Sequence, residues 1–277
     1  MAPGIDIQVH QAEDAALALT NSRAKQPSLN ITSVLSTPTT PDSETLTSTT
    51  LVLNPAFITQ EFDLLRFHAA AFDQLPKTNG DGGTQTPSTT SPAYSTLLIS
   101  SPYNNPGHYL DLANVTTPSL LFAKALTALA PTSSDYATAP YTEALNFDRV
   151  FDLLQDLSIE SGFSYPETEF YVVVFESKLK AGIDQEWLYK LDYESHREAC
   201  ESGGLLKYWF GKADGERRNL ATCFWHSRAD AYQGGLGPWH KKARAAGREL
   251  YESIVFSTLK LTVLEGAKGY RFEKWVE

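Results

Sequence analysis

Two histidines in the last third of the chain have a spacing that suits proton-transfer chemistry. His196 comes four residues after Asp192 in a stretch expected to be helical, so both side chains would lie on one face. A carboxylate placed there can orient an imidazole and raise its pKa, as a general base requires, although surface pairs often have the same spacing. His240 follows Gly237 and Pro238 in the first turn of a second predicted helix, where the helix dipole disfavours imidazolium. We therefore expect His240, His196 and Asp192 to be catalytic.

A third histidine, His226, ends a predicted strand and shares a strand face with Phe224. If that face lines a pocket, His226 contacts the substrate; if it points outward, His226 has no special role. Two histidines and Asp192 could also form a facial metal site, and a single histidine could hold haem. The sequence has no H-x-H or H-E-x-x-H spacing to support a metal, so we expect neither a metal nor a cofactor.

Aromatic side chains are dense in the same part of the chain. The pattern is typical either of a packed core or of an apolar pocket for a flat ligand. In the pocket interpretation, the residues expected to bind substrate are Tyr193, Tyr208, Phe224, Trp225, His226, Trp239 and Tyr251. The two cysteines, Cys200 and Cys223, lie in or beside apolar runs, so we expect them to be buried and unreactive.

The composition is that of a globular chain of 277 residues, 42% hydrophobic and 20% charged, which is enough for a sizeable core. A formal net charge of −10 argues against nucleic acid and anionic membranes as partners. There is no apolar run of about 18 residues, and the N-terminal sequence lacks the pattern of a secretory or transit peptide. We therefore expect no membrane association and a cytoplasmic protein. Hydrolase, P-loop and dinucleotide-binding motifs are also missing.

The first half of the chain divides into two predicted regions. Residues 1–50 form a Ser/Thr-rich arm with too little apolar surface to fold, so we expect disorder there. Residues 51–165 are expected to be mainly helical, and a degenerate second half-barrel is an open alternative. The apolar spacing predicts an amphipathic helix within 53–75, a short strand at 94–100, and helices at 119–129 and 146–158.

In residues 166–277, glycine and proline residues mark the ends of the predicted helices and strands more clearly. Strands are predicted at 169–177, 205–211, 219–226, 253–264 and 270–276, and helices at 184–200 and 238–250. The order β-α-β-β-α-β predicts an α+β, ferredoxin-like antiparallel sheet with two helices on one face. Its strands are apolar on both faces, so the second face needs a cover. Either the N-terminal half supplies it, or a second copy does, as a homodimer through the open sheet face.

The run SHREACESGGLLKYWFG, with RNLATCFWH and GPWHKKARAAG after it, resembles an unassigned-function family found mainly in fungi. The resemblance covers residues 165–277 and implies a dimeric α+β-barrel fold, as in antibiotic-biosynthesis monooxygenases, EthD-like proteins and stress-responsive barrel proteins. It implies no settled chemistry, because fold alone does not fix function.

Three functional hypotheses follow from these patterns. The first is a cofactor-independent enzyme that acts on a small hydrophobic molecule, aromatic or polyketide-like, by general acid/base catalysis. Oxygenation, decarboxylation, dehydration and cyclisation are all open, with proton abstraction beside a carbonyl as the common step. The second is a non-catalytic, ligand-binding or stress-related dimeric protein that uses the same pocket. The third is an interaction protein whose Ser/Thr-rich arm is a docking or phosphorylation segment.

Overall fold

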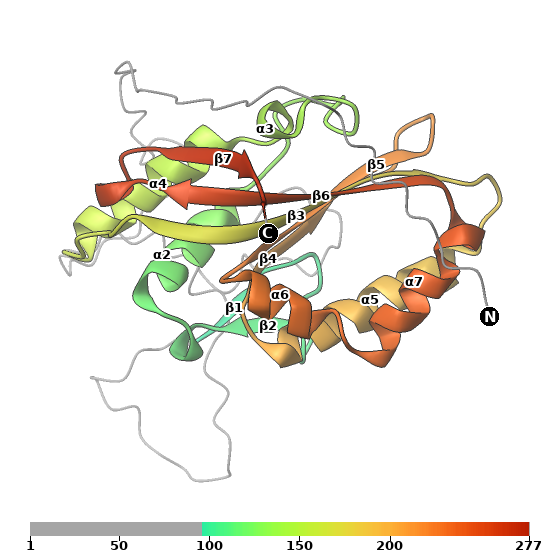
Figure 1. The fold of residues 1–277 in the computed structure, drawn as a ribbon, viewed down its shortest axis with the longest axis horizontal. Coiled ribbons are helices and arrows are strands. Elements are labelled where there is room, and N and C mark those ends of the chain that lie inside the picture. The colour runs from blue at the N-terminus through green and yellow to red at the C-terminus, as the bar shows by residue number, and fades with distance from the viewer. Residues whose placement is uncertain (1–95, 277) are drawn as a thin grey trace, which may run out of the picture.

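The computed structural model of the protein describes residues 96–276. The predicted Ser/Thr-rich arm at 1–50 and the predicted helix within 53–75 lie outside the described residues. Within them the chain forms two regions, residues 96–165 and residues 166–276, which the ribbon in Figure 1 shows in green and in yellow to red respectively.

The second region is the predicted α+β module. Its elements are β3 (Thr168–Leu179), α5 (Gln185–Ser202), β4 (Leu205–Phe210), β5 (Arg218–Trp225), α6 (Arg228–Gly234), α7 (Pro238–Leu250), β6 (Tyr251–Val263), the short helix η5 (Glu265–Ala267) and β7 (Tyr270–Lys274). The strands form one sheet in the order β4-β5-β3-β6-β7, and all neighbours are antiparallel. The first four strands and helices α5 and α7 make the ferredoxin-like βαββαβ unit, which confirms the predicted fold.

Local sequence explains where α5 begins and ends. The side chain of Asp184 accepts a hydrogen bond from the backbone N–H of Trp187 at 2.9 Å, which is an N-cap. Gly203 and Gly204 then take positive φ values of 84° and 79°, which stop the helix and turn the chain into β4. Helix α6 was not expected, because its seven residues, RADAYQG, have no apolar stripe; the Ser227 side chain caps it instead.

The first region packs a hairpin and helices against this sheet. It contains β1 (Leu97–Ile99), β2 (Tyr109–Asp111), η3 (Leu112–Asn114), α2 (Thr117–Ala125), η4 (Leu126–Ala128), α3 (Tyr141–Ala144) and α4 (Phe147–Glu160). β1 and β2 form a separate antiparallel pair. The predicted strand and the two predicted helices of this region are all present, with shifted ends.

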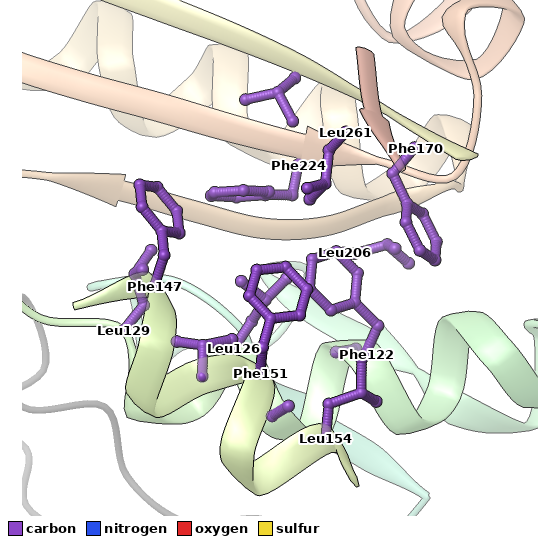
Figure 2. Close-up of a cluster of buried hydrophobic side chains, with 14 of the residues drawn as sticks. Phe122, Leu126, Leu129, Phe147, Phe151, Leu154, Phe170, Leu206, Phe224 and Leu261 are labelled. Atoms are coloured by element: carbon purple, nitrogen blue, oxygen red, sulfur yellow. The ribbon is translucent and has the colours of Figure 1, made fainter. Parts of the chain in front are cut away.

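The two faces of the central strand β3 have different covers. Val172 and Val174 belong to the main apolar core, together with Phe122 from α2 and Phe151 from α4. Val173, between them in sequence, packs on the opposite face in a smaller cluster with Ala199 of α5 and with Trp225. Figure 2 shows the main core, with Phe224 and Leu261 of the sheet facing α2 and α4.

The N-terminal half therefore covers the sheet face that the sequence left open. Phe122, Phe224 and Leu261 are essentially fully buried at this contact, so a homodimer could not form through that face without displacing α2 and α4. Homodimerisation itself stays a prediction. Exposed apolar side chains remain at Ile254, Val255 and Phe256 on β6, beyond the part of that strand that β7 pairs.

Candidate functional site

Five polar and aromatic side chains meet where α5 lies against β4 and the loop between β1 and β2. They are Tyr103 and His108 from the loop, Asp192 and His196 from α5, and Tyr208 from β4. We call these five residues the buried polar cluster. Residues 192 and 196 share a helix face, as predicted, and Tyr208 points to the same side because its strand partner Cys223 faces α5.

Asp192 is the acceptor at one end of the buried polar cluster. The hydroxyl of Tyr208 donates to its Oδ1 at 2.5 Å, and the hydroxyl of Tyr103 donates to its Oδ2. Burial raises the pKa of Asp192, while these two hydrogen bonds lower it. Burial and the nearby carboxylate raise the pKa of both tyrosines, so each hydroxyl keeps its proton. The sequence suggested that Asp192 would orient His196; instead it binds the two tyrosines.

A pair of histidines forms the other end. Nδ1 of His108 lies 2.8 Å from Nδ1 of His196, and the two rings are parallel within 2°. Only one of the two facing nitrogens can carry the hydrogen, so the rings have opposite tautomers at Nδ1. Burial is the main cause that lowers the pKa of both, to about 4 for His108, whose pKa the charge of Arg197 lowers further. Both imidazoles are therefore neutral at pH 7.

One ring nitrogen of this pair lacks a hydrogen-bond partner among the described residues. Nε2 of His108 is buried and has no hydrogen-bond partner among residues 96–276. The ring of His196 has more contacts. Sγ of Cys200 lies 3.7 Å from its nitrogens, and the ring of Tyr208 stacks on it. Burial raises the pKa of Cys200 to about 12, so this sulfur is a thiol rather than a thiolate.

Tyrosine rings surround His108. The ring centroid of Tyr193 lies 4.1 Å from that of His108 and 5.1 Å from that of Tyr103. Tyr189 stacks on Tyr193 and is half-exposed. Tyr193, predicted to bind substrate, is thus beside the buried polar cluster, and the rings give His108 an apolar surround.

His240 does not join this cluster. It lies in the first turn of α7, as predicted, and its Nδ1 is 3.1 Å from Oε2 of Glu198 on α5. The same carboxylate accepts the backbone N–H groups of Trp239 and His240, at 2.7 and 3.0 Å, so it caps α7 from another helix. Gly237 allows this approach, since a Cβ there would lie 2.2 Å from Glu198. Burial lowers the pKa of His240, against the opposing effect of Glu198.

The other residues predicted to bind substrate are dispersed. Phe224 lies in the main core on the opposite sheet face, and Trp225 is buried beside α6. His226 is exposed and binds Ser119 at 2.8 Å. Trp239 lies under the ammonium groups of Lys190 and Lys242, while Tyr251 is part of a small cluster between α5 and α7. Of the predicted set, Asp192, Tyr193, His196 and Tyr208 come together.

Two residues of the site were missed from the sequence. Tyr103 and His108 lie in the segment SPYNNPGHYL, whose Pro, Asn and Gly residues mark a loop but do not show what it contacts. The burial of Lys207, which lies outside the site, was also not expected: only 3% of it is exposed, although it is a lysine in a strand. Alternation around Tyr208 places Lys207 on the opposite face, but no sequence signal distinguishes a buried lysine from an edge one.

No three of the His, Cys, Asp and Glu side chains in residues 96–276 are grouped to hold a metal ion. None of the helices in this range combines the length and the apolar character needed to cross a bilayer. A hollow of about 330 Å³ lies over β6 and the C-terminal end, bounded by Glu169, Lys260, Glu273, Lys274, Trp275 and Val276, away from the buried polar cluster.

A family model described as PB2B2.08-like matches residues 99–274. The chain belongs to the PB2B2.08-like family. A PB2B2.08-like relative, the UPF0643 protein PB2B2.08 of Schizosaccharomyces pombe (strain 972 / ATCC 24843), is 34% identical over 184 residues, which are 64% of this chain and 84% of the relative. The fungal family expected from the sequence is thereby confirmed.

Solved structures similar to the PB2B2.08-like chain cover about a third of it. A protein described as an antibiotic biosynthesis monooxygenase from Nitrosomonas europaea is 15% identical with a TM-score of 0.29, over 32% of this chain and 86% of that one. The hydroxynitrile lyase of Passiflora edulis is 15% identical with a TM-score of 0.28, over 34% and 93%. A dimeric ferredoxin-like protein from Thermobifida fusca YX is 12% identical with a TM-score of 0.27, over 34% and 92%. These similarities concern the fold only.

Proposed function

We propose that this PB2B2.08-like protein is a small-molecule enzyme that moves a proton on a hydrophobic, aromatic or polyketide-like carbonyl compound, without a cofactor. The proposed centre is the buried polar cluster. The observation that supports it best is the Nε2 atom of His108, a fully buried ring nitrogen without a partner in the described chain. Buried polar atoms are nearly always hydrogen-bonded. An unpartnered nitrogen among aromatic rings therefore suggests that a polar group of a bound ligand hydrogen-bonds to it.

In this proposal His108 exchanges the proton with the ligand. When its Nδ1 carries the hydrogen, Nε2 holds a lone pair that can take a proton from carbon or oxygen. The Nδ1–H then donates to Nδ1 of His196, 2.8 Å away, which stabilises the imidazolium that forms. His196 is thus a positioning residue, held by the Tyr208 ring and Cys200.

Asp192 has a different role from the one its spacing suggested. Because Tyr103 and Tyr208 both donate to it, the carboxylate joins the loop, α5 and β4 at one point. This contact fixes the loop that carries His108. His240, engaged by Glu198, is excluded from the proton transfer in this proposal.

Hydrogen exchange at carbon tests the proposal directly. The full chain would be incubated with acetophenone in D₂O at pH 7, and deuterium uptake by the methyl group followed by NMR. We expect uptake above the protein-free rate, reduced about 10²-fold by His108→Gln, the size typical of a general base. His240→Gln is the matched control and should leave the rate unchanged. Equal rates for wild type and His108→Gln would contradict the proposal.

Binding without turnover is the second candidate. The observation in its favour is that Asp192, the acidic group of the cluster, already accepts a tyrosine hydroxyl at each carboxyl oxygen, so both oxygens are engaged within the protein. This alternative predicts that acetophenone resonances broaden in the presence of protein while no deuterium enters the methyl group. Broadening without uptake would favour the binding protein over the enzyme.

A further inference from the structure

The first half of β6 is exposed on both faces of the sheet. Ile254, Val255 and Phe256 are 39%, 44% and 53% exposed, although they lie in a strand next to the central one. Adjacent strand residues point to opposite faces, so neither the helices on one face nor the first region on the other covers this part of β6. Three consecutive exposed apolar residues in a strand indicate a contact surface.

The same stretch of β6 has an open strand edge. β7 pairs only with Leu259–Val263, and the backbone N–H of Trp275 donates to the carbonyl oxygen of Thr258 at 3.0 Å where this ladder ends. Figure 1 shows β6 continuing past the end of β7 toward α7. Backbone polar groups alternate in direction along a strand, so those of Ile254 and Phe256 point to the side of β7, where no strand of the described chain follows.

This edge has an apolar centre and a charge-paired end. The ring of Phe256 packs edge-on against that of Phe175 on β3, with the centroids 4.4 Å apart. Farther along the strand, the carboxylate of Glu252 lies 2.8 Å from Nζ of Lys178 and 3.4 Å from the guanidinium of Arg217. An apolar centre beside polar groups that already have partners is the composition of a protein–protein interface.

The edge is complementary to a second copy of itself. Two identical strands can pair antiparallel about a two-fold axis, which closes the assembly after two copies. Centred on Ile254, this alignment places Ile254 opposite Ile254 and Phe256 opposite Glu252. Glu252 carries the only charge in residues 251–257 and does not face its own counterpart, so no like charges oppose each other across the pair. Charge and register therefore both allow a second copy of the chain to pair with this edge.

We propose that the PB2B2.08-like protein forms a two-fold homodimer in which the exposed edge of β6, residues 252–256, pairs with the same edge of a second copy. The pairing joins the two five-stranded sheets into one continuous sheet and covers Ile254 and Phe256. It differs from a dimer through the sheet face, which α2 and α4 occupy. In the sheet, β5 and β3 separate β6 from β4, which carries Tyr208 of the buried polar cluster. The dimer contact is therefore independent of the proposed function.

Sedimentation velocity of the full chain over a range of concentrations tests the homodimer, and we expect a monomer–dimer equilibrium. Ile254→Lys sets two ammonium groups opposite each other at the axis and should raise the dimer dissociation constant at least about tenfold. Leu236→Lys, at a 56% exposed apolar residue before α7, is the matched control and should leave it unchanged. An equimolar mixture of Ile254→Lys and Ile254→Glu should recover the dimer, because opposite charges then meet. A monomer at every concentration, or a dimer that Ile254→Lys does not weaken, would overturn the proposal.

Amide hydrogen exchange of the unmodified protein, resolved by residue with NMR, tests the backbone pairing without any variant. The amides of Ile254 and Phe256 should exchange more slowly as the concentration rises and the dimer forms. The amide of Val255 points toward β3, so it should be protected at every concentration and serves as the internal control. Slow exchange of Ile254 and Phe256 in a monomer would mean that a segment of residues 1–95 covers the edge, which contradicts the second copy as its partner. Fast exchange of both amides in a dimer would also refute the edge pairing.

Discussion

The two faces of one sheet differ sharply in what they bury. On one face, Trp209 and Phe224 enter a large core made of aliphatic and aromatic side chains from both regions of the chain. On the other, their strand neighbours Tyr208 and Cys223 face α5, where a carboxylate, two imidazoles and two phenols are enclosed. The first face therefore buries mainly apolar side chains, and the second holds the buried polar cluster.

The largest expected effect is on the apolar face. Phe122→Ala removes a fully buried ring that contacts Phe151 and Phe170, which should lower the free energy of unfolding by about 3–5 kcal/mol. Urea denaturation measures it. Ile159→Ala, at a residue 72% exposed on α4, is the control. Similar losses for the two variants would mean that the apolar face is not where stability lies.

Acidification should affect the polar face next. The pKa of His108 falls from its ordinary value to about 4 on folding, so the unfolded chain binds the proton more readily. Stability is then complete above pH 6.5 and decreases as the pH falls toward 4, by up to about 3 kcal/mol. Urea denaturation at several pH values would show a steeper loss for wild type than for His108→Gln. Parallel curves for the two proteins would contradict a neutral buried His108.

Removing one hydroxyl tests the carboxylate. Tyr208→Phe deletes the 2.5 Å hydrogen bond to Asp192 and leaves the buried carboxyl group with one tyrosine donor, which should cost about 2 kcal/mol of unfolding free energy. Thermal denaturation measures the change. Tyr189→Phe, at a half-exposed ring, is expected to cost much less, and an equal cost would argue against a special role for the Asp192 contacts.

The smallest effect concerns the cap of α7. Glu198→Gln weakens the hydrogen bonds to the first turn and should cost about 1 kcal/mol. It should also lower the pKa of His240 further, because Glu198 is what raises it. NMR titration of the imidazole would follow this change, with Glu249→Gln on the exposed side of α7 as the control. An unchanged His240 titration would contradict the contact between Glu198 and His240.

Sequence patterns predicted the elements of the second region because its helices and strands have local punctuation. Asp184, Gly203 and Pro238 mark helix ends within a few residues, and alternating apolar residues mark the strands. The sequence left two alternatives for the cover of the second sheet face, the N-terminal half or a second copy of the chain. The choice between them depends on contacts between α2 or α4 and β3, which no local sequence pattern encodes.

The candidate site was predictable only in part, for the same reason. The four-residue spacing correctly places Asp192 and His196 on one face of α5. Their partners are distant in sequence: His108 precedes His196 by 88 residues, and Glu198 precedes His240 by 42. Helical spacing therefore identified Asp192 and His196 but not their hydrogen-bond partners, and it gave no indication of the loop that supplies Tyr103 and His108.

The shared apolar core has a practical consequence for anyone who wishes to study the α+β module by itself. Severing the chain near residue 165 would remove α2 and α4 and present Val172, Phe224 and Leu261 to water. An exposed apolar sheet surface of that kind tends to associate with other apolar surfaces. The isolated C-terminal piece should thus be recovered as aggregates, whereas the piece that starts before β1 stays dispersed.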